Sequence, residues 1–410
     1  MAEIGLLALM PDPWGDYWGS RHHMLSRISS WFHVVWVDPP LEWREAWRPG
    51  RPKRALPGGQ PPASPGFARY EPSRWLPHFY RPPVLSQWAS RLRWQQARAI
   101  LERRGCRQIV LDLWRPQFEP ALDCLPHDLS CYHITDEYSY SEEEGPVDSR
   151  ERDLIARVGQ VFILSRTTFA KKARYNANSL YLPTGADYQA FTTQHREPDD
   201  LASIPSPRIG YAGYIKRFLD FDLVRTLAER HRDWSFVLIG PESHLGDRAE
   251  LARRLRALPN VYFLGGVRRE ELPAYDQHFD VCMLCYAVNG YTKFVNPLKL
   301  KEYLASGRPV VGAPLPAFEE FADVVELART PEEWSMALER ALAPAASSPE
   351  RVEGRRDVAR RCDWQQLVDR MAETICERLG GAALERFRAI QASAAPAGAT
   401  QASRMEGSIE

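Results

Sequence analysis

The sequence predicts two α/β domains in tandem, each built on a doubly wound parallel sheet. Short apolar runs alternate with helical patterns through most of the chain, and strands separated by helices pair in parallel through right-handed crossovers. The alternation restarts after a polar, proline-rich stretch at 192–207, and 410 residues exceed one ordinary core. We therefore expect an N-terminal domain at 1–191, a linker at 192–207 and a C-terminal domain at 208–345.

The first domain begins with an apolar strand at 3–10, and the periodicity of the next segment predicts a helix with one apolar face. In chain order the remaining elements are expected as a helix at 20–31, a strand at 32–38, a helix near 85–104, strands at 108–114 and 128–134, a helix at 147–158, a strand at 161–165, a helix at 166–175 and a strand at 179–183.

A basic, tryptophan-rich insertion interrupts this domain at about 41–84. Residues 41–107 carry 14 Arg or Lys and 4 Glu, a net charge of +10, together with five Trp and many Pro. The segment is too rich in proline to form one element. It is either a long solvated insertion or a surface for an anionic membrane or a phosphate-bearing acceptor. No nucleic-acid motif accompanies it, so nucleic acid is not an expected partner.

The second domain repeats the pattern of short apolar strands followed by helices. Its elements are expected as strands at 208–214, 234–240, 261–265, 279–286, 308–313 and 324–327 and helices at 217–231, 247–257, 268–276, 297–305 and 331–343. Helices within 346–390 are expected to pack back on the N-terminal domain. Residues 391–410, rich in Ala, Ser and Gly, predict a disordered tail.

Other features bear on location. No apolar run approaches the roughly 20 residues that span a bilayer, and the N-terminus resembles a first strand more than a signal peptide. Seven scattered cysteines suit a reducing cytoplasm. Cys282 and Cys285 lie inside an apolar run, which predicts buried thiols and no metal site.

The most informative stretch is NGYTKFVNPLKLKEYLASGRPVVG at 289–312. Asn296 is a good N-cap, and Gly307 can end the helix in a left-handed conformation. This helix follows an apolar strand, so its N-terminus should lie at the carboxyl edge of the sheet. Backbone amides there, with Lys299, would bind a diphosphate, and Glu302 could accept hydrogen bonds from ribose hydroxyls.

A second phosphate-binding feature is the glycine turn after the strand at 208–214. Gly213 would let the backbone approach a phosphate closely. Lys216 and Arg217 follow it and could neutralise a diphosphate leaving group. The alternative is an ordinary turn with solvated charges.

The segment NPLKLKEYLASGRPVV resembles the donor site of GT-B-fold glycosyltransferases, and its pattern NPxKxxEYxAxGxPVV is most similar to the bacterial exopolysaccharide and teichuronic-acid type. The resemblance covers most of residues 4–342 outside the insertion and includes the segments at 179–191 and 208–224. It implies two Rossmann-like domains around a cleft and a UDP-, GDP- or dTDP-linked sugar donor. It also implies no cofactor or bound metal, and a glycan, lipid-linked or small-molecule acceptor. Such an enzyme would be cytoplasmic, or peripheral at the inner face of the membrane.

One position departs from the family pattern. The first Glu of its E-x7-E motif would fall at Phe294. That Glu commonly touches the donor sugar in retaining members, so its absence favours an inverting mechanism. Sugar contacts are then left to neighbours such as Tyr291, Lys293 or Asn296.

An inverting transfer needs a base for the acceptor hydroxyl. Asp136, with Glu137 second, follows the strand at 128–134, where the similar transferases carry a strand-end acidic motif. Asp16, in the loop after the first strand, is an alternative base. Arg21 and His22 in the same loop are candidates for contact with the acceptor or a phosphate.

Two other functional classes fit the same fold. A nucleotide-sugar epimerase eliminates the nucleotide and would need more acidic and His catalytic residues than the sequence offers. A nucleotide-sugar-binding protein without activity is the other, and Phe294 keeps it open.

Overall fold

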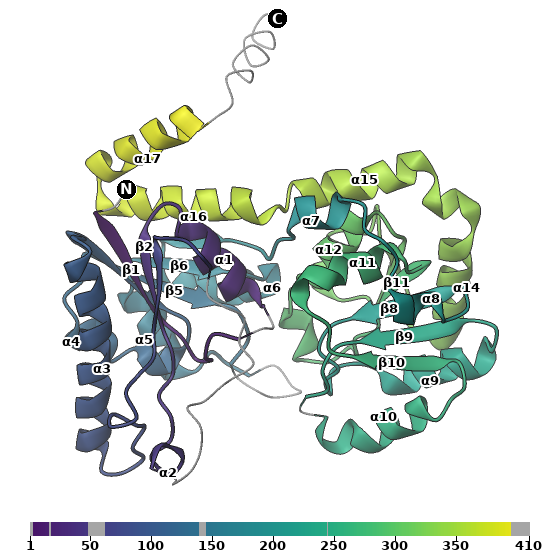
Figure 1. The fold of residues 1–410 in the computed structure, drawn as a ribbon, viewed down its shortest axis with the longest axis horizontal. Helices are drawn as coiled ribbons and strands as arrows, with labels where there is room; N and C mark the ends of the chain where they lie inside the picture. Colours follow the sequence, from purple (N-terminus) through teal and green to yellow (C-terminus); the bar gives the residue numbers. More distant parts are fainter. Residues whose placement is uncertain (1–2, 16–17, 48–61, 139–144, 244, 395–410) are drawn as a thin grey trace, which may run out of the picture.

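The computed structural model describes residues 3–15, 18–47, 62–138, 145–243 and 245–394. It contains two parallel sheets, each flanked by helices, in two domains that lie side by side (Figure 1). Strand order is β3-β2-β1-β4-β5-β6-β7 in the first sheet and β10-β9-β8-β11-β12-β13 in the second. The predicted fold class, two doubly wound α/β domains, is confirmed.

The seven strands of the first sheet are short apolar runs, and most of their residues are buried because helices cover both faces. They are β1 Ile4–Leu9, β2 His33–Val37, β3 Phe67–Tyr70, β4 Gln108–Leu113, β5 Leu129–Ile134, β6 Gln160–Ile163 and β7 Ser179–Tyr181. Their helices are α1 Ser20–Ile28, α2 Trp43–Ala46, α3 Pro83–Arg103, α4 Ala121–Cys124, α5 Ser149–Arg157 and α6 Arg166–Lys172.

The insertion contains an element that its composition did not predict. Residues 67–70 form β3, which pairs in parallel with β2 and makes the edge of the first sheet. A short edge strand tolerates the flanking prolines because only one of its sides needs hydrogen bonds. Residues 48–61 of the insertion lie outside the described residues.

The second sheet has the strand order of an open α/β domain, with β8 and β11 at its centre. Its strands are β8 Arg208–Ala212, β9 Ser235–Ile239, β10 Val261–Gly265, β11 Val281–Leu284, β12 Val310–Gly312 and β13 Glu326–Leu327. The helices around it are α7 Tyr188–Thr192, α8 Asp199–Ala202, α9 Phe221–Arg230, α10 Ala249–Arg256, α11 Leu272–Gln277, α12 Lys299–Ser306, α13 Pro316–Glu319 and α14 Pro331–Leu342. The expected linker at 192–207 thus contains a helical turn, α8.

Three C-terminal helices run across both domains (Figure 1): α15 Pro349–Arg360, α16 Trp364–Leu379 and α17 Gly381–Ala394. α15 packs against α12 of the second domain, whereas α16 packs against α1 and β5 of the first. The expectation that 346–390 packs on the N-terminal domain therefore fits α16 and does not fit α15. Residues 391–394 continue α17, and the rest of the expected tail, 395–410, lies outside the described residues.

Within the described part of the chain, none of the helices has the length and apolar character of a membrane span. Cys282 lies within β11 and Cys285 directly follows it, and both are fully buried free thiols, as their apolar surroundings predicted.

Candidate donor pocket and catalytic cleft

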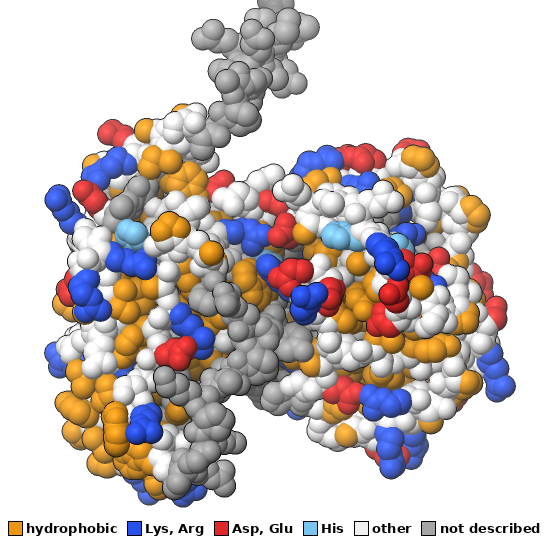
Figure 2. Space-filling view, viewed as in Figure 1, with side chains coloured by type: hydrophobic (Ala, Val, Ile, Leu, Met, Phe, Trp, Pro, Cys, Tyr) orange, Lys and Arg blue, Asp and Glu red, His pale blue; other side chains and the backbone are white. Residues whose placement is uncertain are grey.

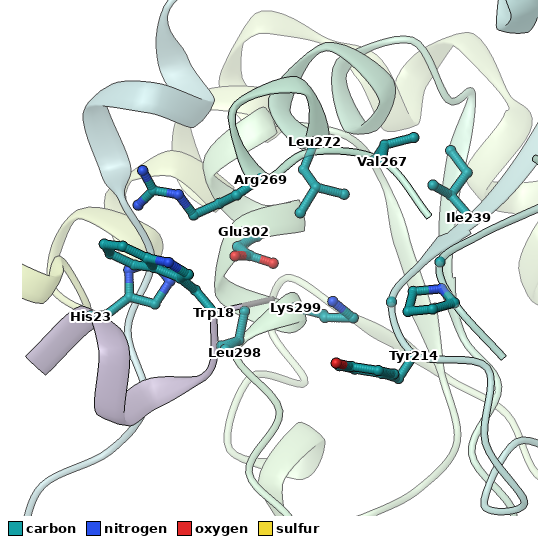
Figure 3. A pocket seen from close by; sticks show the side chains of 13 residues that line it. Trp18, His23, Tyr214, Ile239, Val267, Arg269, Leu272, Leu298, Lys299 and Glu302 are labelled. Carbon is teal, nitrogen blue, oxygen red and sulfur yellow. The ribbon is translucent and has the colours of Figure 1, made fainter. Parts of the chain in front are cut away.

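A pocket lies between the domains at the carboxyl ends of the second sheet's strands (Figure 3). The space in it, together with the open solvent at its mouth, is about 560 Å³. Most of its wall comes from the second domain, and the first domain adds two residues. The lining residues are Trp18, His23, Gly213, Tyr214, Ile239, Gly240, Pro241, Val267, Arg269, Leu272, Leu298, Lys299 and Glu302. Three of the predicted donor residues, Gly213, Lys299 and Glu302, therefore meet in one place.

Two glycines make the floor of this pocket. A Cβ on Gly213 would lie 1.7 Å from the Cε atom of Lys299, so the lysine side chain crosses directly over this glycine. A Cβ on Gly240 would lie 2.0 Å from the carbonyl oxygen of Gly213, and Gly240 has a φ of +137°. The Lys299 side chain is therefore held against the end of β8, at the glycine turn where the sequence predicts a phosphate.

The two glycines predict different substitution effects. In Gly213→Ala the methyl group meets the flexible end of Lys299, so we expect a folded protein whose lysine is displaced and whose nucleotide affinity falls about 10-fold or more. In Gly240→Ala the methyl group meets backbone at a φ that disfavours side chains, so we expect a clear loss of thermal stability. Melting curves with and without nucleotide separate the two. Unchanged nucleotide binding in a folded Gly213→Ala protein would contradict the assignment.

The helix that carries Lys299 and Glu302 is fixed to the sheet by Tyr303. The backbone N–H of Ala212, at the end of β8, donates to the Tyr303 hydroxyl at 2.7 Å. Gly307 ends α12 with a φ of +80°, the left-handed conformation that the sequence predicted. These contacts aim the first turn of α12 at the pocket.

Asn296 does not cap this helix, so that prediction is wrong. Leu298 occupies the capping position and its side chain makes no capping hydrogen bond. The Asn296 side chain instead donates to the carbonyl oxygen of Leu164 in the first domain at 2.6 Å and accepts from the Lys301 ammonium at 2.5 Å. The residue therefore joins the two domains.

Buried charges surround the pocket. Glu302 is 6% exposed, and burial raises its pKa while Lys299 opposes the shift. Behind it, burial and then the Glu302 charge raise the pKa of Asp276 well above its usual range, with Lys299 again opposing. The positive charge of Lys299 thus opposes the upward pKa shifts of both buried carboxyl groups, Glu302 and Asp276. Asp276, in α11, was missed because nothing in its local sequence distinguishes it from a surface aspartate.

The first domain closes one side of the pocket with Trp18 and His23. The Arg269 guanidinium of the second domain lies 3.8 Å from the centre of the Trp18 ring, and Figure 3 shows the two side chains together on one side of Glu302. His23 stacks on Trp364 of α16 at 5.2 Å. Trp18 and Arg269 were missed by sequence reasoning because their pairing joins loops about 250 residues apart.

His22 is a packing residue, which does not support its predicted contact with acceptor or phosphate. It is 6% exposed between the Trp14 and Trp36 rings, and its Nδ1 accepts from the backbone N–H of Gly19 at 3.3 Å. Burial, with help from Arg21 and Arg269, lowers the pKa of His22 to about 3. A neutral, enclosed imidazole has no charge to offer an anion.

This lowered pKa predicts acid sensitivity. The folded pKa lies below the unfolded value, so the stabilisation is complete above about pH 6.5 and is lost as pH falls toward 3. At pH 5 the cost is about 2 kcal/mol. His22→Asn keeps an acceptor for Gly19 and removes the titration, so its loss of stability between pH 7.5 and 5 should be smaller than that of wild type. His127→Asn is the control, and an identical pH profile for His22→Asn would contradict this account.

Lys216, in the loop after β8, interacts electrostatically with charged groups of the first domain. Burial lowers the pKa of Lys216, whereas the carboxylates of Asp136 and Asp12 raise it and Arg21 lowers it. Arg21 is itself paired with Asp12 at 2.5 Å. The predicted donor cation Lys216, the predicted base Asp136 and the predicted contact residue Arg21 therefore lie in one electrostatic cluster.

Asp136 is partly open to solvent at the end of β5. Its side chain is 30% exposed, accepts a hydrogen bond from Thr135 at 3.1 Å and lies 3.9 Å from the Arg115 guanidinium. Arg115 in turn stacks over the Tyr138 ring at 4.5 Å. The Asp136 carboxylate is therefore accessible to solvent.

Glu137 occupies a structural position instead, which corrects its choice as second base. It is 3% exposed and its carboxylate lies 3.2 Å from Lys171 and 3.4 Å from Lys172. Lys172 also pairs with the buried Glu151 at 2.8 Å. This network of two lysines and two glutamates joins α6 to α5 and to the loop after β5, and it encloses the Glu137 carboxylate among the described residues.

The remaining candidates lie around these two centres. Arg217 is exposed on the loop after β8. Tyr291 and Lys293 lie in the loop between β11 and α12, where the Asn289 side chain accepts from the backbone N–H of Tyr291 at 3.0 Å. Phe294 is 2% exposed, and the Lys171 ammonium lies 5.0 Å from its ring centre. Asp16 lies outside the described residues.

Comparison with known proteins finds a family match over most of the second domain. Residues 209–343 match the family described as "Glycosyl transferases group 1". A putative teichuronic acid biosynthesis glycosyltransferase of Bacillus subtilis, TuaH, is 34% identical over 191 residues, which cover 45% of this chain and 47% of that protein. The chain therefore spans about half the length of the curated relative it matches.

Solved structures resemble the whole chain. Sucrose-phosphate synthase of Thermosynechococcus elongatus has 15% identity and a TM-score of 0.66 over 95% of this chain and 99% of its own. The Anabaena protein HepE, solved with UDP and glucose, has 15% identity and a TM-score of 0.64 over 90% and 99%. An Escherichia coli trehalose-6-phosphate protein bound to UDP-2-fluoro glucose has 13% identity and a TM-score of 0.62 over 92% and 99%. At such identities the likeness shows a shared fold.

Proposed function

We propose that this chain is a glycosyltransferase, because residues 209–343 match the family described as "Glycosyl transferases group 1" and the chain has the GT-B fold. It moves a sugar from a nucleoside-diphosphate sugar to a glycan, lipid-linked or small-molecule acceptor. The observation that carries the proposal is the pocket in which Lys299 lies across Gly213 beside the buried Glu302. A cation against exposed backbone at the carboxyl end of a parallel sheet is suited to a diphosphate.

Each side of the cleft has a role in this proposal. Lys299 and Lys216 neutralise the diphosphate, so the reaction needs no bound metal, and Glu302 accepts hydrogen bonds from the ribose. The acceptor hydroxyl gives its proton to Asp136 and its oxygen bonds to the anomeric carbon. The bond from that carbon to the diphosphate oxygen breaks, and the electron pair leaves with the nucleotide.

Phe294 supports inversion at the anomeric carbon. It is buried against Lys171, so the position at which retaining members carry their first motif Glu holds an apolar side chain. Solved structures of the same fold with UDP or a UDP-sugar support a nucleotide-sugar donor. A cytoplasmic enzyme at the inner face of the membrane would favour a lipid-linked acceptor among the three classes.

The test is a thermal-shift screen of the full chain against UDP, GDP, dTDP, ADP and their sugars. A ligand at about 100 times its dissociation constant adds about 2.7 kcal/mol, which gives a clear shift. We expect one nucleotide to raise the melting temperature of the wild-type protein, and we expect sugars linked to that nucleotide to raise it as well. No shift with any nucleotide at millimolar concentration would overturn the donor site. Nucleotide released only when an acceptor is added would exclude the epimerase alternative.

A further inference from the structure

Large hydrophobic side chains are exposed on one end of the first domain. Of the ten that are exposed among the described residues, six lie between positions 43 and 88. We call them the Trp surface: Trp43, Trp47, Trp75, Tyr80, Val84 and Trp88. Figure 2 shows hydrophobic side chains gathered at the lower left, where Figure 1 places α2 and one end of α3. Soluble monomers seldom concentrate exposed apolar groups in this way.

The fold does not need these rings for its own core. The segment is held by backbone contacts: the buried Arg93 guanidinium donates to the carbonyl oxygens of Leu76 and Pro77, each at 2.9 Å. The backbone N–H of Trp43 donates to the carbonyl oxygen of His78 at 3.2 Å. Trp75 is 66% exposed and Trp88 is 56% exposed. The rings are therefore presented outward from a fixed backbone.

Arginines accompany the rings. The Arg44 guanidinium lies 5.2 Å from the Trp43 ring centre, and the Arg74 guanidinium lies 4.9 Å from that of Trp75. Arg81 and Arg91 are exposed beside Val84 and Trp88. Indole rings prefer the boundary between lipid and water, and guanidinium groups prefer anionic headgroups. The tryptophans of the Trp surface are therefore suited to the boundary between lipid and water, and the arginines beside them are suited to the anionic headgroups.

We propose that the Trp surface docks on a bilayer of anionic lipids. This inference rests on the proposed function in one respect, because it would bring the cleft beside a lipid-linked acceptor. The net charge of +10 over residues 41–107 complements an anionic leaflet. The same charge opposes pairing with a second copy, because two such segments would repel each other.

The test is co-sedimentation of the full chain with phosphatidylcholine vesicles, with or without phosphatidylglycerol. We expect binding to the mixed vesicles, little binding to phosphatidylcholine alone, and release at high salt. Trp75→Ala/Trp88→Ala and Arg74→Ser/Arg81→Ser should each weaken binding about 10-fold or more. The matched control is Met336→Ala/Ile390→Ala, which removes two exposed apolar side chains elsewhere, and it should bind as wild type does.

Three results would overturn the proposal. These are equal binding by wild type and both surface variants, equal binding to neutral vesicles, and no vesicle binding at all. A concentration-dependent dimer in light scattering that Trp75→Ala/Trp88→Ala abolishes would assign the surface to a second copy. The thermal shift with nucleotide should be the same in the surface variants and wild type. A failure of the membrane-docking proposal can therefore be distinguished from a failure of the proposed donor site.

Discussion

Replacing Lys299 by Met should abolish sugar transfer while leaving the protein folded. The lysine lies across Gly213 and is the cation that opposes the raised pKa values of both Glu302 and Asp276. Loss of a charged contact to the leaving diphosphate costs more in the transition state than in the ground state, because negative charge develops there. We expect kcat/KM to fall about 1000-fold and nucleotide affinity to fall about 10- to 100-fold.

The control is Arg253→Met on the exposed face of α10, which removes a cation outside the pocket. It should leave the nucleotide-induced thermal shift unchanged. A Lys299→Met protein that melts as wild type does and still shifts fully with nucleotide would place the diphosphate elsewhere. A protein that no longer folds would show that the Lys299 charge is needed to offset the buried Glu302 and Asp276 carboxyl groups. Lys299→Gln would then be the milder variant to measure.

The strands and most helices of both domains could be predicted from sequence, because parallel strands buried on both faces are continuous apolar runs. The elements that were missed have physical reasons. β3 is a four-residue edge strand between prolines, and α8 is a four-residue helical turn inside the stretch expected to be a linker. Neither leaves a periodic signal in one sequence.

The donor half of the site was predictable for a different reason. Gly213, Lys299 and Glu302 lie in two short motifs at strand ends, and a parallel sheet brings such ends together. Residues that meet only across the cleft could not be found this way. Trp18 and Arg269, for example, come from different domains. Asp136 and Glu137 are adjacent in the sequence, but only Glu137 is enclosed by the two lysines of α6, and nothing in the sequence shows this difference.

Tertiary structure decides whether a side chain with suitable chemistry is free to bind a ligand or cap a helix. His22 was chosen for its chemistry, yet the Trp14 and Trp36 rings enclose it and its pKa falls to about 3. Asn296 was chosen for its capping preference, yet its amide is used between domains by Leu164 and Lys301. Local propensity is outweighed in both cases by hydrogen bonds and packing that tertiary structure supplies.

Replacing Asp136 by Asn should remove catalysis and spare donor binding. The carboxylate stands at the end of β5, partly exposed, near Lys216 from the opposite domain. The amide keeps the size and the hydrogen bond with Thr135 but cannot take the acceptor's proton. A positioned general base contributes about 100- to 10,000-fold, so turnover should fall by that amount with the nucleotide-induced thermal shift intact. The assay is nucleotide released from the donor that the screen identifies, with a membrane extract supplying acceptor.

Asp12→Asn provides the matched comparison, because Asp12 is a second carboxylate that acts on Lys216 and is engaged by Arg21. Loss of that carboxylate should lower turnover far less, since its partner is an arginine and not an acceptor hydroxyl. If Asp12→Asn were the more damaging change, or if Asp136→Asn kept its turnover, the base would have to be sought in the loop after β1, where Asp16 is the remaining candidate. If both variants lost nucleotide binding as well, the two carboxylates would act by holding Lys216 in place, because a base that touches only the acceptor leaves donor affinity unchanged.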